Sequence, residues 1–371
     1  MNQALDIIEK MRYRDNTNLY VFSTRVEAEV LLTKAFRGGD PKKGDTKIKV
    51  RRVNEVQSLI SRNLYEFGYE NIFKSAYDEN GIKKINAVVV GMGKHGTEMT
   101  KALAWFCQMD GYQVSINAFD AFPNARDVFV SRCPELMSPK HNGVIDIDGE
   151  AKYHITIHDG IDVRTNTFDS ILEGLPRTTY VFVALGDDEE NISAAIKLRS
   201  FFARMGCKPV IQAIVYNSDK KEALCGITNF KGESYDVDFI GDMKTSYSED
   251  VILDSDVEEV ALARHLRWGK ESDFWQYDYN YKSSIASAIH KEMKIKCGIP
   301  GITKDKEDRT DEELWNIRKL EHCRWNAYMR SEGYVYSGSV QKSTRNDLAK
   351  MHYCLVPFYD LPYEEQIKDD D

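Results

Sequence analysis

Three glycines in the first half of the chain have a spacing suited to holding a nucleotide phosphate. Gly91, Gly93 and Gly96 form the pattern G-x-G-x-x-G directly after a short apolar run. In a nucleotide-binding βαβ unit the first glycine makes a tight turn and the second lets the backbone approach a pyrophosphate, while the third permits close packing of helix on strand. The pattern therefore predicts a phosphate-binding turn.

Charged side chains around these glycines are the next candidates. Lys94 and His95 lie at the start of the helix expected after the turn, where the first N–H groups and the positive end of the helix dipole attract anions. Asp120 lies 24 residues after Gly96, close to the spacing of a carboxylate that binds ribose hydroxyls. These residues favour nucleotide binding over the alternative, a βαβ unit whose glycines serve only packing.

Gly186 and Asp187 begin an acidic stretch after the apolar run 179–185. Ligands in open α/β sheets bind in loops at the carboxyl ends of the strands, so both residues are candidate ligand contacts. Acidic residues also stabilise the first turn of a helix through its dipole. That effect is the alternative explanation for the stretch.

A second set of candidates lies on one expected helix, 311–331, and consists of Glu321, His322, Arg324 and Trp325. Adjacent positions of a helix point in different directions, so the four side chains cannot all face one pocket. A tryptophan with an arginine and a histidine can stack a base and hold a phosphate. In the alternative, Glu321 pairs with Arg324 and Trp325 fills the core.

Apolar periodicity predicts the elements that position these residues. The expected strands are 18–22, 48–53, 85–90, 113–119, 153–159, 179–185 and 208–215. The expected helices are 26–32, 54–67, 97–109, 191–205, 257–268, 282–297 and 311–331. Strands that alternate with helices predict the α/β class, with a Rossmann-like parallel sheet and flanking helices, followed by a small mainly helical domain.

Three other stretches carry separate expectations. The segment 126–148 contains two prolines and predicts a loop. His154 and His158 share one face of a strand about 13 Å apart, too far to share a metal ion. The most basic patch is interpreted as a solvated hairpin edge, with a phosphate ligand as the alternative; it comprises Lys42, Lys43, Lys47, Lys49, Arg51 and Arg52.

Bulk properties narrow the class of protein. The chain has 371 residues, 42% hydrophobic content and a net charge of −9, which argues against direct binding of nucleic acid. Its seven cysteines are scattered, so we expect reduced thiols and a cytoplasmic location. Composition divides the chain into an N-terminal β/α extension, 1–80, a nucleotide-binding domain, 81–250, and a helical linker with a final domain, 251–371. The chain is also compatible with being part of a larger protein.

The first half resembles the regulator-of-potassium-conductance, or TrkA-N, type of Rossmann domain. The match covers about residues 84–245 and rests on the stretch 88–96, on Asp120 and on the acidic G-D-D-x-x-N at 186–191. The acidic stretch is the more specific part, because dehydrogenases do not usually carry it. The resemblance implies binding of NAD(H) or an adenine nucleotide as a signal, and control of a partner in place of substrate turnover. Residues 1–75 and 125–150 have no counterpart in the family.

The last hundred residues resemble the ryanodine-receptor repeat (RyR) domain in its prokaryotic form. The match covers about residues 272–370 and rests on the stretches 281–290, 320–326, 333–336, 355–358 and on Leu361. It adds Tyr334 and His352 to the candidate ligand-binding residues, although tryptophan is common in the family where Tyr334 stands. The resemblance implies a nucleotide-like signal bound in this domain.

These observations predict a ligand-sensing regulatory protein. We expect a homo-oligomer that binds a small-molecule nucleotide and controls a membrane protein, for example in ion transport, or a defence effector. We identify no catalytic residues and no metal site. One alternative is an NAD-dependent oxidoreductase, with His154, His158 or Tyr180 as the proton donor; another is a scaffold whose nucleotide fold has decayed.

Overall fold

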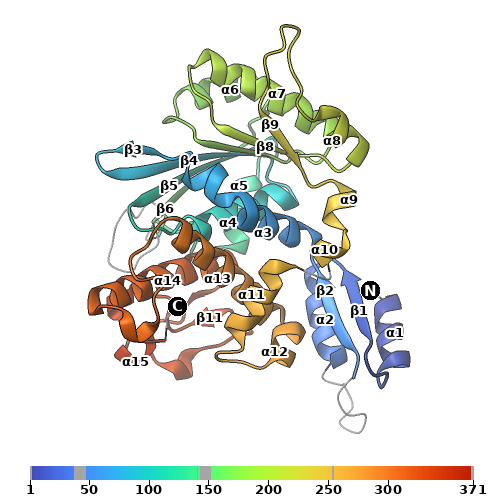
Figure 1. Ribbon diagram of the computed structural model, residues 1–371, viewed down its shortest axis with the longest axis vertical. Coiled ribbons are helices and arrows are strands. Elements are labelled where there is room, and N and C mark those ends of the chain that lie inside the picture. The colour runs from blue at the N-terminus through green and yellow to red at the C-terminus, as the bar shows by residue number, and fades with distance from the viewer. Residues whose placement is uncertain (1, 37–46, 140, 143–151, 253–254, 369–371) are drawn as a thin grey trace. The chain divides into compact units, whose positions relative to one another are not determined.

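The computed structural model describes residues 2–36, 47–139, 141–142, 152–252 and 255–368 (Figure 1). The chain forms two compact units, and each combines two separate stretches of sequence. The smaller unit comprises Met1–Arg62 with Thr245–Ile289, and the larger comprises Asn63–Lys244 with His290–Asp371. The division into segments 1–80, 81–250 and 251–371 stays a prediction.

A seven-stranded sheet forms the centre of the larger unit, among the residues that the structure describes. Its order is β6 (Tyr153–Asp159), β5 (Tyr112–Asp120), β4 (Ile82–Val90), β7 (Tyr180–Val183), β8 (Val210–Ile214) and β9 (Val237–Ile240), all parallel, with β3 (Tyr77–Glu79) antiparallel to β4. Successive strands run outward from β4 on one side and from β7 on the other. This is the order of the doubly wound Rossmann fold, with its switch point between β4 and β7. The predicted α/β class with a Rossmann-like sheet is confirmed.

Helices cover both faces of this sheet. Figure 1 shows α4 (Lys94–Phe106) and α5 (Ala125–Arg132) on one face, and α6 (Asn166–Glu173), α7 (Asp188–Arg204) and α8 (Ser218–Leu224) on the other. Met99, Leu103 and Phe106 of α4 are fully buried, as their spacing predicts. Burial of each such side chain contributes about 1.5–3 kcal/mol, which holds the helix after the glycine turn against the sheet.

The C-terminal part of the larger unit is mainly helical. It contains the end of α13 (Asp278–Lys296), α14 (Asp311–Ser331), α15 (Tyr363–Gln366) and the short parallel strands β10 (Val335–Tyr336) and β11 (Met351–His352). A capping box of Thr310 and Glu313 begins α14. The end of α14 lies against α4, where the rings of Tyr328 and Trp105 are 6.2 Å apart.

The smaller unit contains a parallel pair of strands, β1 (Asn18–Phe22) and β2 (Lys49–Val53). Its helices are α1 (Asn2–Met11), α2 (Val26–Phe36), α10 (Glu249–Ile252), α11 (Asp256–His265) and α12 (Glu271–Gln276). Three of the described helices have residues in both units: α3 (Glu55–Gly68), α9 (Met243–Ser246) and α13. Short helical turns in the larger unit are the π turn Tyr69–Phe73 and the 3₁₀ turns Lys306–Asp308, Lys342–Thr344 and Phe358–Asp360.

Two expectations need correction. The segment 126–148 is not a loop throughout, because its first part forms α5, with Ala125 and Phe129 buried; residues 143–151 lie outside the described part of the chain. The basic patch is not a hairpin edge, because β1 and β2 are parallel. Lys42 and Lys43 lie outside the described residues.

Candidate functional site

The first and last glycines of the turn are required by the protein's own packing. Gly91 has φ of +91°, and a Cβ there would lie 2.4 Å from the carbonyl oxygen of Ala184. A Cβ on Gly96 would lie 1.7 Å from the carbonyl oxygen of Gly91. Neither distance is compatible with a side chain, so these two residues bring α4, β4 and the end of β7 close together.

Gly93 is different, because nothing within the described chain requires it to be glycine. It is the N-cap of α4 with φ of −66° and ψ of −160°, an extended conformation open to any residue. No described atom lies within 4 Å of the position that a Cβ would take. Gly93 is exposed and borders a cavity.

That cavity, of about 270 Å³, lies between the glycine turn and α5. It is lined by Met92, Gly93, Thr97, Asp120, Phe122, Ala125, Val128, Phe129 and Arg132. Phe122 and Val128 are 52% and 40% exposed, unusual for large apolar side chains in a groove. The volume is just below the usual range for small-molecule sites, about 300–1,000 Å³.

Asp120 ends β5, as predicted, and its carboxylate lines the cavity. Its Oδ2 accepts a hydrogen bond from the Met92 N–H at 2.5 Å, and its Oδ1 accepts one from the Phe122 N–H at 2.7 Å. A carboxylate oxygen can accept more than one hydrogen bond, so both oxygens keep capacity for hydroxyl donors. The residue therefore holds the turn to the end of β5 and presents an acceptor to the cavity.

Lys94 and His95 form the first turn of α4, which contains no acidic residue. The Nδ1 of His95 lies 3.3 Å from the hydroxyl of Tyr216, and the two rings meet edge to face. Lys94 is exposed, and neither residue is among those that line the cavity. A cation at a helix N-terminus opposes the dipole unless an anion is bound nearby.

The acidic stretch at α7 makes its bonds inside the protein. Asp187 is the N-cap of α7, and its Oδ1 accepts from the N–H groups of Glu189 and Glu190 at 2.9 and 3.1 Å. Asp188 accepts from the Tyr216 and Asn217 N–H groups. Gly186 has φ of +96°, which explains a glycine before the helix. Asp187 and the acidic residues after it therefore stabilise the start of α7, in agreement with the dipole alternative, and Asp187 in addition caps the helix.

Glu321 and Arg324 lie on the side of α14 that faces α13. The Glu321 carboxylate is 2.9 Å from the Lys294 ammonium and 2.5 Å from the Arg324 guanidinium, and all three side chains are buried. Burial, with the cation of Lys294, holds the pKa of the neighbouring His290 well below its usual value. The structural pairing of Glu321 with Arg324 is therefore present.

His322 and Trp325 of α14 contact the segment 352–358. The His322 ring is 2.9 Å from the Val356 carbonyl oxygen, and Trp325 lies 4.9 Å from the ring of His352. Burial lowers the pKa of His352 to about 4, so its ring is neutral near pH 7. Tyr334 is buried, with its ring 6.0 Å from the ammonium of Lys350. The candidates on α14 therefore contact different internal partners, Lys294 for Glu321 and residues 352–358 for His322 and Trp325.

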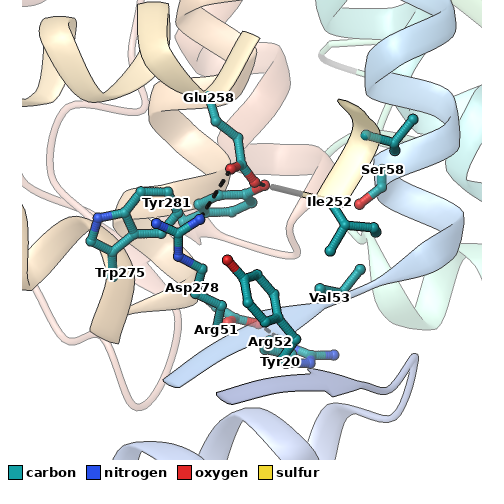
Figure 2. A pocket seen from close by; sticks show the side chains of 11 residues that line it. Tyr20, Arg51, Arg52, Val53, Ser58, Ile252, Glu258, Trp275, Asp278 and Tyr281 are labelled. Carbon is teal, nitrogen blue, oxygen red and sulfur yellow. Dashed lines mark hydrogen bonds and ion pairs between the residues drawn. The ribbon is translucent and has the colours of Figure 1, made fainter. Parts of the chain in front are cut away.

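A second pocket lies within the smaller unit and is lined in part by Arg51 and Arg52 of the basic patch (Figure 2). The Arg51 guanidinium stacks on the ring of Trp275 at 3.6 Å and pairs with Glu258 at 3.9 Å, while Arg52 pairs with Asp278. Burial raises the pKa of Glu258 against the effects of Tyr281 and Arg51. The cavity is about 30 Å³, room for a water molecule or two. These arginines form structural pairs, so the expectation of a solvated edge is wrong for them.

Four residues of α5 that face the cavity are not among the site residues predicted from the sequence. Ala125, Val128, Phe129 and Arg132 have the spacing i, i+3, i+4 and i+7, which marks one helix face. The prolines at 134 and 139 led to a loop prediction for the whole segment. The helical spacing before them was the available signal.

No protein-family model matches this chain, and no curated protein matches it either. The resemblances to the TrkA-N and RyR domains therefore stay predictions. Within the described residues, no group of three or more metal-binding side chains is gathered, and no helix is long and apolar enough to cross a membrane.

Proposed function

We propose that this protein binds a nucleotide, NAD(H) or an adenine nucleotide, at the glycine turn 91–96 and acts as a regulator of a partner. The observation that carries the proposal is Gly93. Packing explains Gly91 and Gly96, but Gly93 has neither a positive φ nor a neighbour that would exclude a side chain. A ligand phosphate that approaches the backbone would supply the missing reason.

The groups around the cavity suit the rest of a nucleotide. The Asp120 carboxylate is placed to accept hydrogen bonds from ribose hydroxyls, and Phe122 and Val128 offer exposed apolar surface for a base. Arg132 adds a guanidinium for a second anionic group. The cavity also lies at the carboxyl ends of β4 and β5, the edge of the sheet where ligands bind in such folds.

Calorimetry tests the proposal directly. Adenosine 5′-monophosphate, adenosine 5′-diphosphate, ATP, NAD⁺, NADH and cyclic AMP are titrated into the wild type, Gly93→Val and Gly174→Val. Gly174 is a matched control, because it also has a negative φ and no atom closer than 3.4 Å to a Cβ position. We expect binding by the wild type and Gly174→Val, and at least about tenfold weaker binding by Gly93→Val. No binding by the wild type would overturn the proposal.

The oxidoreductase alternative gains no support from the cavity. Tyr180 is fully buried and donates to Gln212, and His154 and His158 are not among the residues that line the cavity. A nicotinamide absorbance change with a substrate panel would revive this alternative.

The regulatory part of the proposal includes a homo-oligomer and a protein partner, a membrane transport protein or a defence effector. Sedimentation with and without the bound nucleotide tests the oligomer. Because the RyR-like candidates on α14 contact different partners inside the protein, we restrict the ligand proposal to the glycine turn.

A further inference from the structure

The helix α5 forms one wall of the candidate nucleotide cavity and ends directly beside the C-terminal end of α14. Its residues Ala125, Val128, Phe129 and Arg132 line the cavity. A ligand that fills the cavity therefore contacts α5 along its length. Any displacement of this helix by the ligand must reach the residues that follow Arg132.

Backbone atoms connect the end of α5 to the end of α14. The Cys133 thiol donates to the carbonyl oxygen of Ser331 at 3.1 Å. A Cβ on Gly333 would lie 2.6 Å from the carbonyl oxygen of Arg132, and Gly333 has φ of +84°. The two chain segments are thus in close contact.

Glu135 adds a charged connection between the same segments. Its Oε1 accepts from the Tyr336 N–H at 2.8 Å, and its Oε2 lies 3.5 Å from the Nε of Arg330. Arg330 is fully buried. Loss of one partner of a buried charge is costly, so Glu135 strongly favours the present arrangement.

The helix α4, which forms another wall of the cavity, also contacts the end of α14. Lys101 of α4 pairs with Glu332 at 3.0 Å and with Glu98 at 3.3 Å. Burial opposes the charge of Lys101, but these carboxylates outweigh it and raise its pKa. We call the contacts of Arg132, Cys133 and Glu135 with Arg330, Ser331 and Gly333 the α5–α14 junction.

We propose that the α5–α14 junction couples the nucleotide cavity to the C-terminal helical region, so that ligand binding stabilises the end of α14. The inference rests on the proposed function and adds the route by which binding is transmitted. A ligand that binds one position of α5 more tightly than another shifts the population of both segments. By thermodynamic linkage, a change at the junction alters ligand affinity without touching the ligand.

Hydrogen exchange on the wild-type chain gives the first test. Amide exchange is measured with and without saturating adenosine 5′-diphosphate or NADH, whichever binds in calorimetry. We expect exchange at residues 331–336 to slow at least about fivefold, the lower end of typical coupling, while exchange in α8 stays unchanged. Bound ligand without a change at 331–336 would overturn the inference and leave the proposed function standing. No binding at all would overturn both.

Variants give the second test. Glu135→Gln is compared with Glu313→Gln, which loses the pair with Lys304 at the other end of α14, about 26 Å away along the helix. We expect the dissociation constant to rise at least about fivefold in Glu135→Gln and to stay at the wild-type value in Glu313→Gln. Cys133→Ala is a milder change that serves if Glu135→Gln does not fold. Equal affinities in the junction variants and the wild type would contradict the coupling.

Discussion

The N-termini of α4 and α7 differ in the charged residues of their first turns. Both helices follow central, adjacent strands of one sheet, β4 and β7, so both begin at its carboxyl edge. The first turn of α7 contains Asp188, Glu189 and Glu190, and Asp187 caps it. The first turn of α4 has no acid and begins with Lys94 and His95.

This difference shows where a ligand is expected. The N–H groups and the dipole at a helix N-terminus favour negative charge, whatever its source. In α7 the chain supplies that charge itself, through hydrogen bonds from Glu189 and Glu190 to Asp187. In α4 an open glycine stands at the N-cap and borders a cavity. The first turn of α4 has no acidic residue of its own, so a ligand phosphate at this N-cap would supply the charge that α7 supplies itself.

The largest effect is expected from Gly96→Ala. Its Cβ would lie 1.7 Å from a backbone oxygen, so α4 must move away from the turn, at a cost of about 3 kcal/mol or more in the free energy of unfolding. Gly186→Ala is the matched change before α7, where only the positive φ is strained, and we expect a cost of about 1–2 kcal/mol. Urea unfolding measures both. Equal losses of unfolding free energy in the two variants would show that the two turns are packed equally tightly.

Gly93→Asp converts the start of α4 into a copy of the start of α7. The new carboxylate can cap the helix and interact with its dipole, so we expect stability to rise by about 0.5 kcal/mol. The carboxylate would also occupy the position of a ligand phosphate and repel its negative charge, so nucleotide affinity should fall at least about tenfold. Thermal unfolding and calorimetry measure the two effects. Unchanged affinity in this variant would place the ligand elsewhere.

Asp187→Ala removes the internal anion of α7. The loss of the two capping hydrogen bonds should cost about 1 kcal/mol of stability and leave nucleotide affinity unchanged. Denaturant unfolding measures the loss of stability, and calorimetry measures the nucleotide affinity. Loss of affinity at wild-type stability would instead make Asp187 a ligand contact, as the sequence alone allowed.

Lys94→Glu has the smallest expected effect on stability. An acid in the first turn of α4 interacts favourably with the dipole, by about 0.3–1 kcal/mol. The same change should weaken the binding of an anionic nucleotide, most strongly at low salt, where charges are least screened. Calorimetry at two salt concentrations measures the difference. Tighter nucleotide binding by the variant would contradict a phosphate at this helix.

The glycine turn, Asp120 and five strands of the large sheet could be predicted because their signals are local, whereas β3 and β9 were not predicted. An apolar run that ends in closely spaced glycines determines a strand, a turn and a helix start within about a dozen residues, and Asp120 follows at the end of the next strand. The strand at 179–185 and the helix after it could be predicted for the same reason. The sequence left two roles open for Asp187, ligand contact and stabilisation of the helix start.

Tertiary structure alone decided what lies around the turn. Arg132 borders the cavity because α5 folds beside α4, and its carbonyl oxygen meets Gly333, about 200 residues later, because α14 packs on both. The same holds for Glu321 and Trp325, which the helix period places near each other on α14 but which contact different partners, Lys294 and His352. Local sequence determines the period of a helix or strand. The partner of each face depends on how distant segments fill one common core, a property of the whole chain.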